Sequence, residues 1–442
     1  MLTSNNYLSN IILDTYLITH WLKEDEMKTN KIGYKDILKQ KEYMKIITAA
    51  LINRLGDSVD AIASAWIVYE LTRQAYWSAL IYALNLIPSV LITPLAGAFV
   101  EKKSKKKIMI LTDLIRALCV AYIATAYMGG FLQGWHLIIT TLIISTAEAF
   151  RGPSSSALTP LVLEEEYYEY GTSLSMSLST IVEMAATGIA AGIIALIGTA
   201  GAIYIDMVTF VISALIISTL HVTEVSKLET SFKVRQYLTT VKEGFQYAIH
   251  LNALLFLCLI AMFLNAILVP FNSMQAPFVK EILGGDASAL SVIGVTMSIS
   301  ALLASISYPK ISKKVSPRFL MVSCATVIGM FYIGLIAGKA FYVTKAGMYG
   351  ITTLLFFMLG IVVGWVNSFA SVQFMKIIDP QYLARCGALL TSLSMGVSPI
   401  ASFAVSVVAH TASVSTIFAG CGVLAIFVTI LLLFSKTLKG MK

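Results

Sequence analysis

Six acidic residues lie inside or at the ends of long apolar segments, and all fall in the first half of the chain: Asp57, Asp60, Asp113, Glu148, Glu183 and Asp206. The second half has no acid at such depth. A charge at the centre of a bilayer costs roughly 2.5 to 3.5 kcal/mol, so charged residues there are candidates for function. Because a carboxyl group can bind and release a proton, this asymmetry indicates a transporter whose coupling chemistry lies in its first half.

Five of the embedded charges are expected to form one cluster. Arg54, Asp57 and Asp60 share a face of the first apolar segment and lie roughly 13, 18 and 22 Å from its last preceding lysine, at 1.5 Å of rise per residue. Asp113 and Arg116 lie at roughly 9 and 13 Å in the third segment, which runs parallel to the first. Pairs such as Arg54 with Asp113, or Asp57 with Arg116, are therefore predicted. The cluster either exchanges protons or is a purely structural set of ion pairs.

The other embedded acids differ in their surroundings. Glu183 stands in the middle of the fifth apolar segment with no basic residue near it in the sequence, and burial favours the neutral form of an acid. We therefore expect Asp57, Asp60 and Glu183 to carry the coupling protons. Asp206 and Glu70 lie closer to the outer ends of their segments, where we expect them to contact water.

The composition indicates that these residues belong to a membrane protein. Hydrophobic residues make up 57% of the chain and charged residues 13%, and the mean hydropathy is +0.80, values outside the range of soluble globular domains. A helix needs about 18 or more apolar residues to cross the hydrocarbon. Such helices are predicted near 45–71, 76–100, 107–128, 132–151, 172–197, 200–220, 251–277, 286–308, 316–337, 346–374, 386–409 and 412–435. The predicted fold is an all-α integral membrane protein with twelve transmembrane helices in two six-helix bundles.

The pattern of spans also predicts the domain organisation. An N-terminal leader covers 1–43. Its first 26 residues lack the features of a signal peptide; we expect them to be dispensable or to follow an upstream start, with a position on the membrane surface as the alternative. The first bundle covers 44–220 and the second 251–435. A charged linker at 221–250 joins the bundles, and a short tail follows at 436–442. A substrate site between two such bundles is typical of secondary transporters built from repeats.

Lysine and arginine in short loops predict the orientation, because such loops are retained in the cytoplasm. Basic residues gather in the loops on one side, while the other side has only Arg73, Lys280, Lys339 and Lys345. This bias places both termini and the linker in the cytoplasm of a multi-pass protein of the cell membrane. It also accounts for the net charge of +8 without a nucleic-acid partner.

The turn between the second and third spans has the most specific motif. Residues 97–107 read GAFVEKKSKKK, in which Gly97 allows close helix approach and Glu101 can meet a cation. The motif resembles motif A of the major facilitator superfamily, with Glu101 and Lys102 in place of its aspartate and arginine. Segments 54–57, 95–98, 112–117, 282–285, 379–380 and 384–385 strengthen the resemblance to the macrolide-efflux branch, which also includes siderophore exporters.

The resemblance implies alternating access of two bundles and export of a hydrophobic or amphipathic small molecule in exchange for protons. By position, Gly97, Glu101, Lys102 and Lys105 inherit the role of a cytoplasmic gate. We expect Glu148 and Arg151, at the cytoplasmic end of the fourth span, to clasp this loop through Lys105. The chain departs from the antiporter pattern at 188–192, which keeps two glycines but lacks a proline.

A substrate cavity between the bundles would be lined by aromatic groups and a few hydrogen-bonding groups. The candidates are Trp66, Tyr69, Tyr82, Asn265, Phe271, Asn272, Gln275, Trp365 and Asn367. For the aromatic residues, packing or lipid contact is the competing interpretation.

Other functional classes have less support in the sequence. There is no GxxxxGK[ST], HExxH or GxSxG motif, so no enzymatic activity and no cofactor are expected. The five cysteines lack metal-ligand spacing, and no metal site is expected. The expected partners are the lipid bilayer, protons and a small amphipathic substrate, with the protein acting as a monomer. Two alternatives remain open, a proton-coupled importer and a non-transporting receptor or scaffold on a transporter fold.

Overall fold

The computed structural model describes residues 34–222, 252–312, 314–377 and 383–434, except 94, 95, 97, 98, 101 and 102. The sequence predictions for most of the leader, for nearly all of the linker and for the C-terminal tail therefore lie outside the described residues. So do Gly97, Glu101 and Lys102 of the loop motif.

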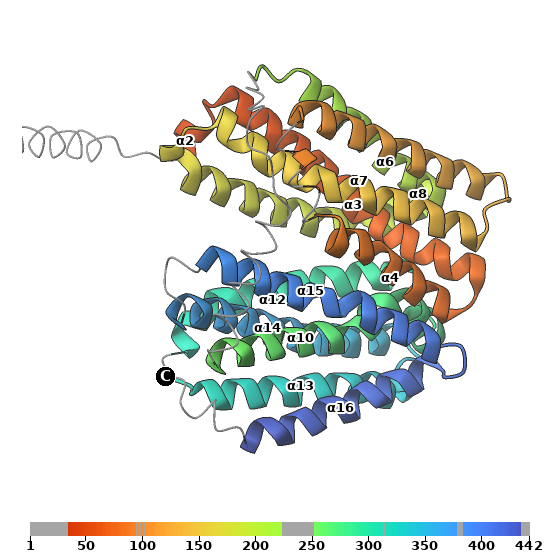
Figure 1. Cartoon of the computed structure of the whole chain (residues 1–442). Coiled ribbons are helices and arrows are strands. Elements are labelled where there is room, and N and C mark those ends of the chain that lie inside the picture. The colour runs from red at the N-terminus through yellow and green to blue at the C-terminus, as the bar shows by residue number, and fades with distance from the viewer. Residues whose placement is uncertain are drawn as a thin grey trace, which may run out of the picture.

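The first half of the chain forms one group of helices, at the top of Figure 1. Its long helices are α3 (Lys41–Thr72), α4 (Ala75–Leu91), α6 (Lys105–Met128), α7 (Gly134–Val162) and α8 (Tyr168–Ser218). Two short elements, α2 (Tyr34–Ile37) and the 3-10 helix η1 (Glu165–Tyr167), precede α3 and α8. The backbone of α8 leaves the helical region at Gly198, where φ is +75°. Glycine adopts this conformation at little cost, and the break divides α8 into the two spans expected from the sequence.

The second half of the chain forms the lower group in Figure 1. Its long helices are α10 (Asn252–Ser273), α12 (Ala287–Ile311), α13 (Pro317–Ala337), α14 (Lys345–Ile377), α15 (Leu383–Val408) and α16 (Val414–Phe434). The short elements are α11 (Gln275–Pro277), the π-helix η2 (Phe278–Leu283) and the 3-10 helix η3 (Gly338–Phe341). Within the described residues, and with α8 counted as two, the long helices number twelve, six in each bundle. The predicted fold class is confirmed.

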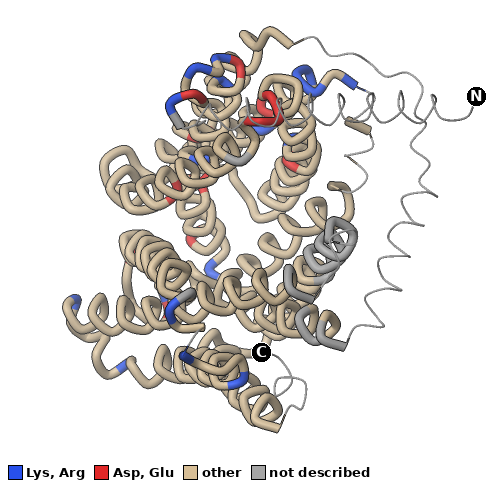
Figure 2. Tube along the Cα trace, turned by 90° about the vertical axis from the view of Figure 1, so that its left-hand side faces the viewer, with Lys and Arg blue, Asp and Glu red and all other residues tan. Residues whose placement is uncertain are grey.

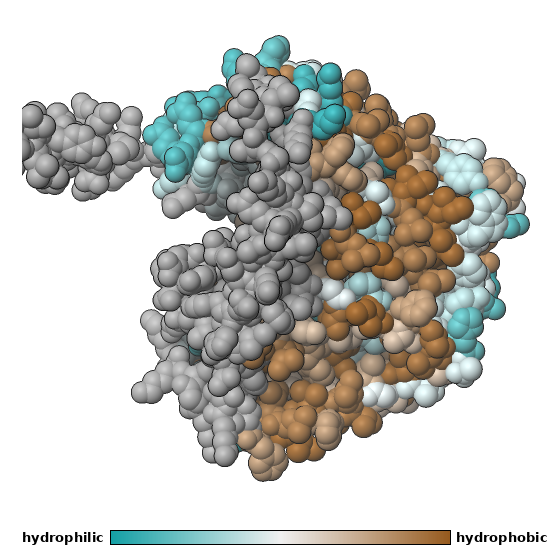
Figure 3. Space-filling view, in the orientation of Figure 1, coloured by the Kyte–Doolittle hydropathy of each residue, from teal (hydrophilic) through white to brown (hydrophobic). Residues whose placement is uncertain are grey.

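The lengths and compositions of the helices suit a membrane. Among the described residues, six helices are long and apolar enough to cross one, or seven if the bent pair Cys258–Ser273 and Gln275–Leu283 is one span. The kinked α8 counts once in that six, and α4 is apolar but shorter. Figure 3 shows a band of apolar side chains between more hydrophilic ends of the molecule. The chain is a multi-pass membrane protein.

The two ends of the bundles differ in their charge. We call the end at which α3 and α6 begin, with Lys41 and Lys105, the basic end, and the end at which they finish, with Thr72 and Met128, the distal end.

Serine and aspartate side chains cap the starts of helices at both ends. Ser104 accepts a hydrogen bond from the Lys107 amide at the start of α6, as N-cap residues do.

The contacts between the two bundles lie toward the distal end. Ser402 of α15 donates a hydrogen bond to the Ala79 carbonyl of α4 over 2.7 Å. Ser291 of α12 accepts one from the Ala191 amide of α8 over 3.1 Å. Figure 1 shows the bundles close together on the side of α4 and diverging toward the side where α2 lies. The arrangement is therefore closed at the distal end and parted at the basic end.

Candidate functional site

Arg116 is the centre of an ion-pair network inside the first bundle. Its guanidinium lies 2.6 Å from Oδ1 of Asp57 on α3 and 2.7 Å from Oε2 of Glu148 on α7. It also lies over the ring of Phe210 on α8, 4.0 Å from the centroid. The predicted pair of Asp57 and Arg116 is present, and one buried cation serves two carboxylates.

Asp113 forms a second, fully buried group. Its Oδ1 lies 2.5 Å from Nε of Arg151, and its Oδ2 accepts a hydrogen bond from Ser213 over 2.6 Å. Asn53 donates a further hydrogen bond to Oδ1. Helices α3, α6, α7 and α8 thus meet at one carboxylate that has no solvent exposure. Buried charges are tolerated when they are paired and hydrogen-bonded in this way.

Arg54 and Glu183 pair with each other, which corrects two expectations. The guanidinium of Arg54 lies 2.6 Å from Oε2 of Glu183 on α8, so Arg54 does not pair with Asp113. Glu183 is without a basic neighbour in the sequence but has one in the fold, because α8 packs along α3. The two side chains are 48% and 42% exposed, whereas the arginines of the other three ion pairs, Arg116 and Arg151, are only 6% and 9% exposed.

Two acids of the network have no basic partner among the described residues. Asp60 accepts a hydrogen bond from Ser64 over 3.0 Å. Asp206 is 1% exposed and accepts one from Thr209 in its own helix. Asp206 is also within electrostatic range of Asp57, Asp60 and Arg116. The expectation that Asp206 contacts water is wrong, because the surrounding helices close over it.

Gly56 explains how α8 comes so close to the acids of α3. A Cβ atom at residue 56 would overlap the Asp206 carboxylate and the Thr209 hydroxyl. Only a residue without a side chain leaves room for both groups against α3. The sequence segment 54–57 therefore combines a cation, a close approach and an acid within one turn.

Glu148 and Arg151 lie deeper in the network than expected. Glu148 binds Arg116 and Arg151 binds Asp113, so both side chains hold α7 to α6. Lys105 lies 3.4 Å from the carbonyl oxygen of Lys103. The i, i+3 spacing of Glu148 and Arg151 indicated a shared face but not its partners.

Some of the expected cavity residues do bridge the two bundles. Tyr69 of α3 donates a hydrogen bond to Oε1 of Glu281 in η2 over 2.8 Å, and Lys280 lies 5.6 Å from the ring centroid of Trp66. Tyr82 of α4 shares a hydrogen bond with the side chain of Asn272 in α10.

The remaining expected cavity residues fall into two groups, those that are packed inside the second bundle and those that are exposed or half-buried. Phe271 is buried among Phe278, Phe331 and Phe356, so it belongs to the core of the second bundle. Trp365 donates a hydrogen bond to Ser307 within that bundle. Three further residues, Asn265, Gln275 and Asn367, are exposed or half-buried, and Asn265 bonds to its own helix at the Ala261 carbonyl.

The network has an excess of acids that limits its chemistry. Six carboxylates, those named at the start of the sequence analysis, face three arginines, Arg54, Arg116 and Arg151. Figure 2 shows the acids gathered in the first bundle. Buried carboxylates without a cation take up protons rather than remain charged. Among the described residues, no group of His, Cys, Asp and Glu could hold a metal ion. The site suits proton binding.

Sequence reasoning missed Glu281 and undervalued Asp206. Glu281 lies beside the Leu283–Gly285 turn and has no distinguishing pattern in its own half of the chain. Asp206 and Gly56 carried a signal, since an acid and a glycine in neighbouring helices are compatible with close packing. Recognising it required the α3 and α8 pairing, which spacing along the chain does not reveal.

Comparison with known proteins identifies the family. Residues 36–442 match the model of the family described as transmembrane secretion effector. The chain is 24% identical over 325 residues to the uncharacterized MFS-type transporter YvqJ of Bacillus subtilis, covering 73% of this chain and 74% of that protein. It is 23% identical to macrolide efflux protein A of Streptococcus pyogenes, covering 78% and 85%. The fold matches that of the nucleoside transporter NupG with a TM-score of 0.67 and 16% identity, covering 89% of this chain and 100% of that one. The chain is a member of the transmembrane secretion effector family, in the macrolide-efflux branch of the major facilitator superfamily.

Proposed function

We propose that this transporter exports a hydrophobic or amphipathic small molecule across the cell membrane in exchange for protons. The observation that carries the proposal is the excess of carboxylates over arginines in the first bundle, together with Asp206, a buried carboxylate without an arginine in its described ion pairs. The names of relatives such as macrolide efflux protein A support efflux and a macrolide-like substrate.

The distribution of lysines supports an orientation with the basic end in the cytoplasm. In that orientation the bundles meet at the outer side and part at the inner side, as in an inward-facing transporter. Tyr69 with Glu281, and Ser402 with Ala79, then belong to the outer closure. Substrate would enter between the parted ends, and Tyr82 and Asn272 would lie at the closed limit of its path.

The partners of each acid favour some residues as proton carriers. Asp57 can be neutralised without leaving Arg116 unpaired, because Glu148 remains bound to the same guanidinium. Asp60 and Asp206 have no arginine to leave unpaired. Asp113 is the sole acidic partner of Arg151 among the described ion pairs, so its protonation would leave a buried cation uncompensated. We assign the coupling protons to Asp57, Asp60 and Asp206, and a structural role to Asp113.

Glu183 is a less favourable candidate for a proton carrier than its position in the sequence predicted. Its pair with Arg54 is half-exposed, and the pair joins α3 to α8 near the parted side of the molecule. Breaking and remaking this pair during the transport cycle would regulate access rather than store a proton.

The experiment uses purified full-length protein in proteoliposomes with a pH-sensitive dye inside. A panel of macrolides and other amphipathic compounds is added, and proton movement and compound movement are recorded together. Asp206→Asn is expected to lower proton movement at least tenfold at equal reconstitution. Glu70→Gln is the matched control, because Glu70 is an exposed acid of α3 bonded to Tyr127 and should retain normal exchange.

Three results would contradict the proposal in different ways. Compound movement down the proton gradient, in the same direction as protons, would identify an importer. Compound binding without proton or compound movement would identify a receptor. Full exchange in Asp206→Asn together with loss in Glu70→Gln would refute the assignment of the carriers while leaving antiport intact.

A further inference from the structure

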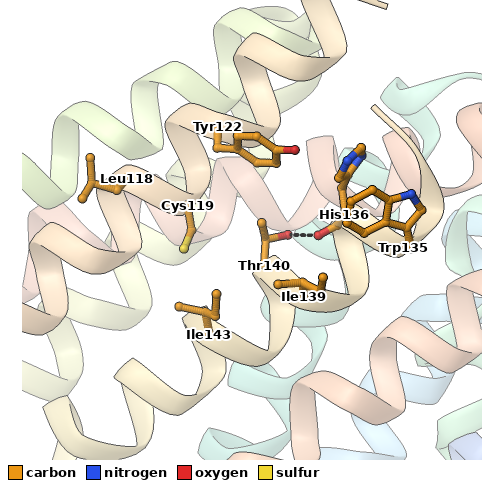
Figure 4. A pocket seen from close by; sticks show the side chains of 8 residues that line it. All are labelled: Leu118, Cys119, Tyr122, Trp135, His136, Ile139, Thr140 and Ile143. Atoms are coloured by element: carbon orange, nitrogen blue, oxygen red, sulfur yellow. Dashed lines mark hydrogen bonds between the residues drawn. The ribbon is translucent and has the colours of Figure 1, made fainter. Parts of the chain in front are cut away.

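A long groove runs between α6 and α7 on the outer face of the first bundle. Its distal part has a volume of about 300 Å³ and its basic part about 460 Å³, and Ile143 lines both. Figure 4 shows the distal part, where Tyr122 of α6 lies toward His136 of α7 and Leu118 lies farther along α6. The two parts therefore adjoin at Ile143, on a face that the bilayer covers.

The basic part of the groove has the chemistry of an acyl-chain site. Its lining residues are almost all apolar and come from the loop before α6 and from both helices: Phe99, Ile108, Leu111, Thr112, Ile115, Leu142, Ile143, Thr146, Ala147 and Phe150. From Ile108 to Ile115 the groove follows α6 for about 10 Å. One leaflet of the hydrocarbon core is about 15 Å thick, so the basic part lies within a single leaflet.

Two lysines stand at the basic end of this groove. Lys107 lies one helical turn before Leu111, on the same face of α6, and Lys103 precedes the Ser104 cap. Both are exposed, and neither side chain has a hydrogen bond or ion pair among the described residues. The acidic residue of α7, Glu148, forms its ion pair with Arg116 and not with either of these lysines. A positive charge thus sits where a lipid headgroup would lie above the groove.

We propose that the basic part of the groove is a binding site for an anionic phospholipid. The phosphate of the lipid would bind Lys103 and Lys107, and one acyl chain would lie along Leu111 and Ile143. Basic residues at the membrane surface attract anionic headgroups, and the groove adds contacts that a flat helix face lacks. The site is separate from the ion-pair network and does not depend on the proposed transport function.

The test measures lipid binding to the full-length protein by native mass spectrometry. Protein purified in detergent is titrated with equimolar long-chain phosphatidylglycerol and phosphatidylethanolamine. The double variant Lys103→Gln with Lys107→Gln is expected to weaken phosphatidylglycerol binding about 25-fold at low salt, roughly fivefold for each lysine. Leu111→Trp fills the groove at a position that is already 58% exposed, so it should also weaken binding without disturbing the core.

Matched variants elsewhere in the chain serve as controls. Lys310→Gln with Lys314→Gln removes two exposed lysines at the end of α12, and Leu215→Trp enlarges an exposed side chain of α8. Both should leave phosphatidylglycerol binding unchanged. The proposal is overturned if the groove variants bind this lipid as the wild type does, or if phosphatidylethanolamine binds equally well. It is also overturned if glycerol phosphate, which has no acyl chain, competes with phosphatidylglycerol at equal affinity. A protein dimer that contains no lipid and that Leu111→Trp dissociates would overturn it too, because the groove would then be a contact between two protein chains.

Discussion

Two aspartates bound to buried arginines should respond very differently to the same substitution. Asp113 and Asp57 each lie within 2.6 Å of an arginine whose side chain is less than 10% exposed. Asp113→Asn removes the only acidic partner that Arg151 has among the described ion pairs. Asp57→Asn leaves Arg116 bound to Glu148. The comparison therefore isolates the cost of leaving a buried cation unpaired.

The expected magnitudes follow from burial. Asp113 has no solvent exposure, and breaking a fully buried pair costs about 3–5 kcal/mol. The Asp57 side chain is 36% exposed, so loss of its pair should cost about 1 kcal/mol or less. At about 2–4 °C per kcal/mol for a domain of this size, Tm should fall by about 6–20 °C in Asp113→Asn and by about 4 °C or less in Asp57→Asn.

The assay is thermal denaturation of the purified variants in one detergent, followed by size-exclusion chromatography of the protein that remains folded. The double variant Asp113→Asn with Arg151→Gln should recover part of the loss, because it removes the stranded charge. Equal Tm values for the two single variants, or a larger fall in Asp57→Asn, would refute the reasoning. Such a result would mean that Glu148 does not compensate Arg116.

Two smaller predictions concern the closed distal side and a helix cap. Tyr69→Phe removes the hydrogen bond to Glu281, worth about 1 kcal/mol, so spin labels on the distal ends of α3 and α13 should report about fivefold more of the separated state. Asp286 caps α12 by accepting from the Ser288 amide, and its hydrogen bonds to Ser288 lower the pKa of its carboxyl group. The stabilisation is therefore present above the unfolded pKa of about 3.8 and is lost as pH falls through the lower folded pKa. Asp286→Ala should lower stability by about 1 kcal/mol at pH 7 and by much less at pH 2, measured as Tm at the two pH values.

The fold was predictable because its main signal, the length of the apolar segments, can be read along the sequence. The length of apolar segments indicates membrane helices without knowledge of their neighbours, and even the break at Gly198 was readable as a turn. The Asp57 and Arg116 pair was also predicted, because the two residues lie at similar depths on parallel helices, although the same argument predicted the pair of Arg54 with Asp113, which is not formed. These successes share one property, which is that they need only distance along a helix.

The remaining pairs depended on which helices are neighbours and on rotation about each axis. Glu183 lacked a basic residue nearby in sequence, yet α8 brings it to Arg54. Arg151 was expected to contact the loop before the third span, but its position on α7 directs its side chain toward Asp113. Phe271 has the composition of a ligand contact and the burial of a core residue. Spacing along the sequence cannot predict these contacts, because it shows which residues share a face of a helix but not which neighbouring helix that face contacts.

The location of the network constrains how protons could drive the bundles. All its described ion pairs lie within the first bundle, so protonation does not break a bond between bundles directly. Helix α3 carries both Asp57, within the network, and Tyr69, which reaches Glu281 of the second bundle, about 18 Å apart along one helix. In α8, by contrast, Asp206 and Ala191, which bonds to Ser291, lie on opposite sides of the break at Gly198. A proton taken up between α3 and α8 would therefore act by shifting these two helices against each other, and the shift would reach the distal contact of Tyr69 with Glu281 through the continuous backbone of α3.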